Sequence, residues 1–313
     1  MEVIRDIDNS DVQPCVATIG FFDGVHRGHR FLIEQVKRVA AEEGLRSALI
    51  TFPIHPRKVM QKDYQPLLLS TPKEKAELLA STEADYCVML DFTPQLAKLS
   101  AKEFMEDVLK KRLNVRTLVI GYDHRFGHNR SEGFEDYCRY GEEIGIKVVR
   151  AEACVIDGIN VSSSVIRHLL QNGEMEKANK CLGYEYYLDG TVVDGYKVGR
   201  TIGFPTANLK VEDPDKLVPA DGVYAVKVTV AGQEHYGMLS IGVRPTMNNG
   251  ANRSIEVNIF DFSSNIYDKF IRITFVKYTR PELKFDSLDA LIEGLRQDEK
   301  TIREIFKNYT NKN

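Results

Sequence analysis

The sequence of 313 residues has few cysteines, no long apolar run and no large excess of charge of either sign. Its five cysteines are scattered and form no CxxC pair, which predicts free thiols in a reducing cytoplasm. No stretch approaches the roughly 18 consecutive apolar residues of a transmembrane helix, so we expect no contact with a membrane. The net charge of −3 means that the chain lacks the excess of positive charge typical of nucleic-acid-binding proteins, which argues against nucleic acid as a partner.

The chain also lacks internal repeats, low-complexity segments and a signal-peptide pattern. Residues 1–8 are acidic and have no apolar core of the kind that a secretory signal needs. With 43% hydrophobic residues the chain can build a core of ordinary size, and its length favours two domains over one.

The first half of the chain alternates between strand-like and helix-like segments. Strands are expected at 48–52, 86–90, 117–120 and 147–149, and helices at 31–41, 72–80, 101–111, 132–145 and 162–170. Alternation at this spacing predicts an α/β domain, with a parallel sheet that carries helices on both faces. Ligands of such sheets bind outside the carboxyl ends of the strands.

The pattern of expected secondary structure changes at about residue 183, after which short strands follow one another closely. Strands are expected at 222–230, 235–241, 254–260 and 270–277, which predicts an all-β domain built as an antiparallel barrel. Residues 287–306 place apolar side chains at helical spacing, so a final helix is expected to pack across the barrel. The predicted domains are 1–182 and 183–313.

The most informative stretch runs from Gly20 to His29, between an apolar strand and an amphipathic helix. A glycine-rich turn at a helix start directs backbone N–H groups and the helix dipole toward one point, which suits a phosphate group. His26 and His29 lie three residues apart on this turn and could donate hydrogen bonds to the phosphates of a nucleotide. The other candidates for ATP binding in this stretch are Gly20, Phe21, Phe22, Asp23 and Gly28.

Two further segments of the first half are candidates for the same crevice. Ser162, Ser163 and Ser164 can cap a helix and hold a phosphate, and Arg167 can neutralise charge on a phosphoryl group, although a plain helix cap would look the same. Residues 121–127 follow an expected strand and are either a third wall of the site or an ordinary polar loop.

The second half has its own signature, GRTIGFPTAN, between Gly199 and Asn208. Thr206 and Asn208 carry hard oxygen atoms suited to Mg²⁺, in what we expect to be a compact loop that also includes Gly203. Glu256 lies within an apolar strand. Its carboxylate either faces solvent on the alternation or is a general base held on a rigid strand.

These motifs give the chain a close resemblance to the bifunctional riboflavin kinase/FAD synthetase family over nearly its whole length. The turn at 20–29 resembles the HxGH signature of nucleotidyltransferases in the form FDGVHxGH. Residues 51–57 are similar to TFxPHPR, and 161–167 to ISSSxIR. In the second half, GRxIGFPTAN is the riboflavin kinase signature, and 221–224, 240–246 and 280–285 match further kinase segments.

The resemblance implies a Rossmann-like nucleotidyltransferase domain, followed by a riboflavin kinase barrel with a C-terminal helix. The implied substrates are riboflavin, FMN and ATP, with FAD as product and Mg²⁺ as cofactor, in a cytoplasmic monomer or weak homo-oligomer. Glu256 would be the kinase base, while His26, His29 and Arg167 would act in adenylyl transfer. The implied flavin-binding residues are His55, Asp123 and Phe126 in the first half, and Arg280 and Glu282 in the second.

The chain departs from the family pattern at a few positions. His124 stands where an aromatic residue is common, Asn160 where an arginine is common, and residues 265–268 replace DLYG. Two alternatives therefore remain beside the bifunctional enzyme. One is a kinase whose other half is inactive or acts on a different substrate, and the second is a flavin-binding regulator without activity.

Overall fold

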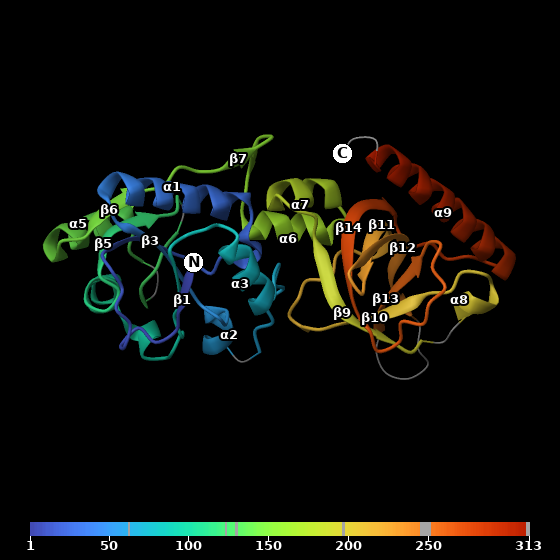
Figure 1. Ribbon diagram of the computed structural model, residues 1–313, viewed down its shortest axis with the longest axis horizontal. Coiled ribbons are helices and arrows are strands. Elements are labelled where there is room, and N and C mark those ends of the chain that lie inside the picture. Colours follow the sequence, from blue (N-terminus) through green and yellow to red (C-terminus); the bar gives the residue numbers. More distant parts are fainter. Residues whose placement is uncertain (62, 123, 129–130, 196–197, 245–251, 311–313) are drawn as a thin grey trace. The chain divides into compact units, whose positions relative to one another are not determined.

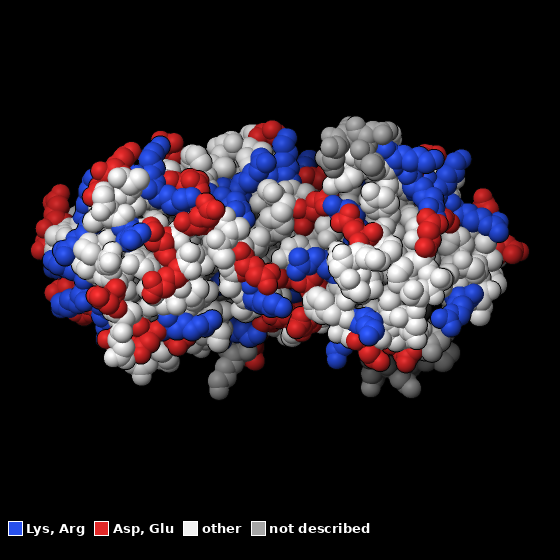
Figure 2. Space-filling view, viewed as in Figure 1, with Lys and Arg blue, Asp and Glu red and all other residues white. Residues whose placement is uncertain are grey.

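The computed structural model describes residues 1–61, 63–122, 124–128, 131–195, 198–244 and 252–310 (Figure 1). The chain divides into two compact units, Met1–Ser163 and Ser164–Asn313. No helix in the described ranges is both long enough and apolar enough to cross a bilayer. On the visible face of each unit, acidic and basic side chains are interspersed (Figure 2).

Unit 1 is built on a six-stranded sheet in which every pair of neighbouring strands is parallel. Its spatial order is β1-β4-β3-β2-β5-β6. The strands are β1 (Glu2–Ile4), β2 (Cys15–Ile19), β3 (Arg46–Thr51), β4 (Tyr86–Met89), β5 (Val115–Ile120) and β6 (Lys147–Arg150). Because the chain moves outward from β2 to β3 and β4 and then crosses back to β5, the order reverses between β2 and β5. That switch point is where doubly wound sheets bind their ligands.

Helices cover both faces of this sheet, as the alternation predicted. Val16 and Leu49 face α1 and α3, while Ala17 and Ala48 face the opposite layer, which contains η3 and α5. The helical segments are η1 (Asp23–Val25), α1 (Arg27–Glu43), α2 (Pro56–Met60), α3 (Pro72–Ala80), η2 (Leu96–Lys98), α4 (Ala101–Glu103), η3 (Phe104–Lys110) and α5 (Phe134–Ile144).

The helix expected at 101–111 differs from the prediction, because only its first turn is α-helical. Ser100 and Glu103 form a capping box that starts α4, and η3 then continues as a π-helix to Lys110. A short hairpin, β7 (Val155–Ile156) with β8 (Ile159–Asn160), follows β6 and was not expected from the sequence.

Unit 2 contains a closed antiparallel barrel with the strand order β10-β13-β12-β11-β14-β9, in which β9 pairs with β10 to close the ring. Its strands are β9 (Tyr187–Val193), β10 (Ala207–Val211), β11 (Gly222–Val230), β12 (Gln233–Arg244), β13 (Asn252–Ile259) and β14 (Phe270–Arg280). A short helix, α8 (Val198–Thr201), lies between β9 and β10. The barrel was predicted, but the two strands that close it were not.

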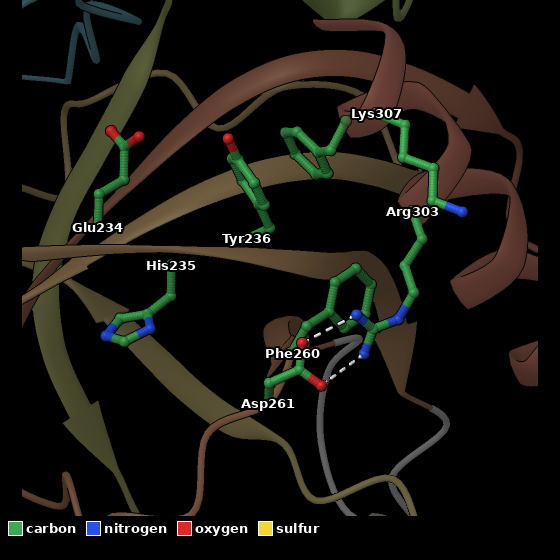
Figure 3. A pocket seen from close by; sticks show the side chains of 8 residues that line it. Glu234, His235, Tyr236, Phe260, Asp261, Arg303 and Lys307 are labelled. Carbon is green, nitrogen blue, oxygen red and sulfur yellow. Dashed lines mark hydrogen bonds and ion pairs between the residues drawn. The ribbon is translucent and has the colours of Figure 1, made fainter. Parts of the chain in front are cut away.

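The long helix α9 (Leu288–Thr310) packs across the barrel, as expected. Its residues Ile302 and Phe306 are buried against Val223, Ala225 and Met238 of β11 and β12. Between α9 and the strands lies a groove of about 420 Å³, shown in Figure 3, where Arg303 makes a bidentate ion pair with Asp261.

The contact-based division of the chain falls after Ser163, the first residue of α6 (Ser163–Gln171), and so before α7 (Met175–Leu182). The change in sequence pattern placed the boundary after residue 182. Both helices join unit 2 through hydrogen bonds. The Ala220 N–H donates to the Leu170 carbonyl, and the Asn179 side chain donates to the Phe275 carbonyl.

Candidate functional site

The turn after β2 has the strained backbone expected of a phosphate-binding loop. Phe22 has a φ of 54° and is buried, and Gly24 has a φ of 76°. Gly28 opens α1 at a position where a Cβ would lie 2.9 Å from the Val161 carbonyl oxygen and 3.1 Å from the imidazole of His26. Only a glycine therefore allows the helix start to approach the His26 ring and residue 161.

The two histidines stack on one another at the N-terminus of α1. Their ring centroids lie 3.6 Å apart, with an interplanar angle of 19°. His26 is the N-cap, and its Nδ1 accepts a hydrogen bond from the His29 N–H at 3.3 Å. Because Nδ1 accepts, the proton of the neutral ring is assigned to Nε2, which lies 3.2 Å from the Ser163 hydroxyl.

Ser163 joins the second predicted motif to the first. Its hydroxyl donates to the Asp23 carbonyl at 3.2 Å while it contacts His26. Ser164 and Arg167 follow on α6, and Arg167 lies one turn beyond Ser163 on the same side of that helix. Ser162 is half-buried, directly before α6.

Asp23 is buried and orients the turn. Its carboxylate accepts hydrogen bonds from the backbone N–H groups of Leu69 at 2.9 Å and Ser70 at 3.1 Å, and the Ser70 hydroxyl accepts from the Gly24 N–H at 2.9 Å. These bonds attach the segment before α3 to the nucleotide turn. The Asp23 carboxylate is thus engaged by backbone N–H groups of that segment.

Sequence reasoning missed Lys75, a lysine of α3 that is only 2% exposed. Its ammonium group donates to the Phe52 carbonyl at 2.6 Å and to the Phe21 carbonyl at 3.2 Å, and it lies 3.8 Å from the centroid of the Phe21 ring. It therefore bridges the chain just beyond β2 and β3. Burial lowers the pKa of Lys75 to about 8, and the nearby Asp23 opposes that shift.

The segments expected to hold flavin approach the same turn from two strands. His55, the N-cap of α2, lies edge-on to Phe21 with the ring centroids 4.7 Å apart. After β5, a Cβ on Gly121 would lie 3.7 Å from the Leu32 side chain, so this loop begins beside α1. Asp123 lies outside the described residues.

Phe126, a predicted flavin-binding residue, is buried in the core of unit 1. It is 8% exposed, and its ring stacks on Tyr137 of α5 with the centroids 4.3 Å apart. His124, at the position where the sequence departs from the family, stacks more loosely on Phe126 at 6.3 Å. The His124 ring thus extends an aromatic row that begins in the core.

In the barrel, three oxygen-bearing side chains meet where β10 pairs with β13. The Thr206 hydroxyl donates to Oε2 of Glu256 at 3.2 Å, and Asn208 stands directly opposite Glu256 in the register. The Ser254 hydroxyl lies 3.4 Å from the other carboxylate oxygen. Glu256 is half-buried between these two hydroxyl groups.

The local structure around this site corrects one expectation. Asn208 belongs to strand β10 rather than to a loop, because its backbone pairs with both Glu256 and Val193. The turn before it depends on two glycines. Gly199 lies against the Phe204 carbonyl, and Gly203 has a φ of 85°.

A cavity of about 510 Å³ opens beside Thr206 and is bordered by residues 262–267. The departure from DLYG falls on this border. Asp268 has a φ of 58°, a backbone conformation that glycine favours and that aspartate tolerates, and the Asn265 side chain accepts from the Tyr267 N–H at 3.1 Å. The residues present here therefore form a turn.

The structure places the two predicted flavin-binding residues at the end of β14 differently from one another. The Arg280 guanidinium makes a bidentate ion pair with Asp298 of α9, at 2.8 and 2.6 Å. Glu282 is exposed, and its carboxylate lies against the α-carbon of Gly242.

Comparison with known proteins matches a family to each half of the chain. The sequence model of the FAD synthetase family matches residues 8–165, and that of the riboflavin kinase family matches residues 182–306. The bifunctional riboflavin kinase/FMN adenylyltransferase of Listeria monocytogenes is 40% identical over 93% of this chain and 92% of its own length. The Escherichia coli K12 protein of the same name is 36% identical over 98% of both chains.

A crystal structure of a macrolide-efflux protein from Streptococcus pneumoniae has the same fold. It is 32% identical, has a TM-score of 0.85 and covers 97% of this chain and 99% of its own. The two matched families together define an enzyme of nucleotide-dependent phosphoryl and nucleotidyl transfer. The chain belongs to the family of bifunctional riboflavin kinases/FMN adenylyltransferases.

Proposed function

We propose that the second half, 183–313, phosphorylates riboflavin to FMN, and that the first half, 1–182, adenylylates FMN to FAD and releases pyrophosphate. One observation carries the proposal: in each half, side chains far apart in the sequence meet to form one polar site. His26 lies beside Ser163 in the first half, and Thr206 lies beside Glu256 in the second.

In the kinase half, Glu256 accepts the proton of the ribityl 5′-hydroxyl while that oxygen attacks the γ-phosphorus of ATP and ADP leaves. The strand fixes the carboxylate, and Thr206 and Ser254 orient its two oxygens. The cavity beside Thr206 accommodates the nucleotide, next to Arg200.

The side chains of Thr206 and Asn208 fit a magnesium ion that arrives with ATP, because both carry hard oxygen atoms and lie beside the Glu256 carboxylate. No group of three or more His, Cys, Asp or Glu residues in the described ranges could form an all-protein cage. Mg²⁺ prefers one or two protein ligands completed by phosphates and water. Bound there, the ion would neutralise charge on the β- and γ-phosphates.

In the adenylyltransferase half, the FMN phosphate attacks the α-phosphorus of a second ATP and pyrophosphate leaves. The nucleophile is already an anion, so positioning and charge stabilisation carry the step. His26, His29, Ser163 and Arg167 hold the phosphates at the helix N-termini, and the turn from Gly20 to Gly28 supplies backbone N–H groups. His55 and the loop after β5, including Asp123 and Phe126, receive the flavin.

We propose a cytoplasmic enzyme, monomeric or weakly self-associating, whose partners are its small-molecule substrates. All five cysteines are free thiols, which suits a reducing compartment. Size-exclusion chromatography with light scattering, over a range of protein concentrations, measures the oligomeric state.

A time course with riboflavin, ATP and Mg²⁺ tests the function, with the flavins separated by chromatography. We expect FMN to rise first and FAD to follow, and both to stop when EDTA removes Mg²⁺. FMN without FAD would mean that the first half acts on another substrate. No conversion by a folded protein that still binds flavin would favour a regulator.

A further inference from the structure

Lys75 of α3 is a buried cation to which the proposed mechanism gives no role. It is 2% exposed, and burial lowers the pKa of Lys75 to about 8, so keeping a charge at this place costs free energy. Its ammonium group donates to the Phe52 carbonyl at 2.6 Å and to the Phe21 carbonyl at 3.2 Å. An apolar side chain would form neither bond, so the two carbonyls show what the lysine contributes.

The two carbonyls belong to segments that follow neighbouring strands of the sheet. Phe21 lies in the nucleotide turn, Gly20 to His29, just after β2, and Phe52 directly follows β3. Three residues beyond Phe52, His55 is the N-cap of α2. The turn is assigned to ATP above, and His55 is assigned to the flavin. Lys75 therefore joins the segment of one substrate to the segment of the other.

Phe21 is held by a second donor and by its ring. The Thr51 hydroxyl, at the end of β3, donates to the same Phe21 carbonyl at 3.2 Å. The Lys75 ammonium lies 3.8 Å from the centroid of the Phe21 ring, and the His55 ring is edge-on to it at 4.7 Å. Lys75 and Thr51 are buried, whereas Phe21 and His55 are half-buried. The hydrogen bonds thus lie beneath two rings that are partly open to solvent.

The helix that carries Lys75 is itself attached to the nucleotide turn. The Asp23 carboxylate accepts from the N–H groups of Leu69 and Ser70, directly before Thr71, the N-cap of α3. Lys75 lies one helical turn later, and its backbone N–H donates to the Thr71 carbonyl at 2.8 Å. Because the start of α3 is fixed in this way, the ammonium group holds the two carbonyls at defined positions.

We propose that Lys75 is a positioning residue for adenylyl transfer, which holds the nucleotide turn at Phe21 and the segment that carries His55 at the separation the reaction needs. The FMN phosphate must stand in line with the α-phosphorus of ATP, and a misplacement of about 1 Å can cost such a reaction about a hundredfold. The bonds lie beneath the two segments, so each segment can still bind its own substrate without them. The inference rests on the proposed assignment of the first half to FMN adenylylation.

Lys75→Met is the direct test, because methionine keeps an unbranched, buried side chain but donates no hydrogen bond. The rate constant of FAD formation is measured in a single turnover, with the full chain in excess over supplied FMN and with saturating ATP and Mg²⁺. We expect it to fall at least about tenfold, while the steady-state KM values for FMN and ATP change less than about twofold. A partly unfolded preparation would lower the amplitude of the single turnover and leave its rate constant unchanged.

Thr51→Val is the second variant, and Lys37→Met is the matched control. Valine keeps the shape of Thr51 but removes the other donor to the Phe21 carbonyl, so the rate constant should fall about threefold. Lys37 also donates to a backbone carbonyl of the same unit, that of Thr82 at 2.9 Å, but it does so away from the nucleotide turn. We expect Lys37→Met to keep the native rate constant.

A native rate constant in Lys75→Met overturns the inference, as does a loss of amplitude alone or an equal fall in Lys37→Met. A rise in either KM that accounts for the whole loss also overturns it, because the lysine would then serve the binding of one substrate. If Lys75→Met does not fold, Thr51→Val decides. Failure of the proposed function is a separate result, since the native chain would then form no FAD from supplied FMN.

Discussion

The Ser163 hydroxyl lies 3.2 Å from Nε2 of His26, although 137 positions separate the two residues in the chain. The same hydroxyl donates to the Asp23 carbonyl, within the turn that His26 ends. Ser163 of the Ser-rich motif is therefore in direct contact with the histidine turn. A ligand bound by one of these two motifs would lie next to the other.

We expect His29→Ala to lower FAD formation about a hundredfold, because a site that relies on positioning loses one oriented group. FMN formation from riboflavin should be unchanged. The measurement is the steady-state rate of each reaction with its own flavin substrate. The control is His128→Ala, an exposed histidine of the same unit whose ring contacts the Ala97 carbonyl. Equal loss of both activities in His29→Ala would contradict the assignment of two sites.

Glu256→Gln should have the opposite effect. The amide keeps the shape of the side chain but cannot accept the proton, so FMN formation should fall at least about a hundredfold. Supplying FMN should restore FAD production to the native rate. Glu234→Gln, an exposed glutamate of the neighbouring strand β12, should behave as the native protein. Undiminished FMN formation by Glu256→Gln would remove Glu256 as the base.

Gly28→Ala should damage the adenylyltransferase site without unfolding the unit. The new methyl group would lie 2.9 Å from the Val161 carbonyl oxygen and 3.1 Å from the His26 ring, so the stacked histidines must move. We expect FAD formation to fall about tenfold or more. The control is Gly133→Ala, where a Cβ meets nothing within 4 Å. An active Gly28→Ala variant would show that the His26 position is not required.

Lys75 predicts a pH dependence of stability. Its pKa is about 8 in the folded protein against an ordinary value of 10.5, chiefly because burial disfavours the charge. Between these values the unfolded chain binds more protons than the folded one, so the contribution of Lys75 to stability rises with pH. The unfavourable contribution is complete below pH 8 and is gone above about pH 10.5.

Lys75→Met removes this dependence. The free energy of unfolding of the native protein, minus that of the variant, should rise by about 2 kcal/mol between pH 7.5 and 10. Urea unfolding of the full chain, followed by circular dichroism at fixed pH values, measures the difference. Lys37→Met is a control, since Lys37 is a partly exposed lysine of α1 that pairs with Glu34. A difference that stays constant with pH would mean that Lys75 titrates normally.

The strands that close the barrel show where sequence patterns were insufficient. In β9, Asp189 and Gly190 are typical of a turn, yet Asp189 makes a bidentate ion pair with Arg272, and Gly190 lies against the Lys210 carbonyl. Those interactions involve β14 and β10, which are far along the chain. Local composition therefore favoured a loop, and pairing with distant strands produced a strand.

Local sequence patterns were enough to establish the alternation that builds the parallel sheet, the short strands of the barrel, and the motifs that carry His26, His29, Thr206, Asn208 and Glu256. Such features are local, because periodicity and turn residues act over a few positions.

Which side chains come into contact depends on the packing of distant segments, which the sequence patterns do not reveal. A lysine on an amphipathic helix such as α3 is ordinarily expected in solvent. Lys75 is buried instead, because the Phe21 and Phe52 carbonyls, which follow β2 and β3, lie close enough to accept hydrogen bonds from its ammonium group. An aspartate such as Asp298 on α9 is likewise expected at the surface. It instead accepts a hydrogen bond from the Arg280 guanidinium, 18 positions earlier in the chain. Contacts of this kind form when segments that are distant in the sequence pack together, and a pattern within one segment does not specify its distant partner.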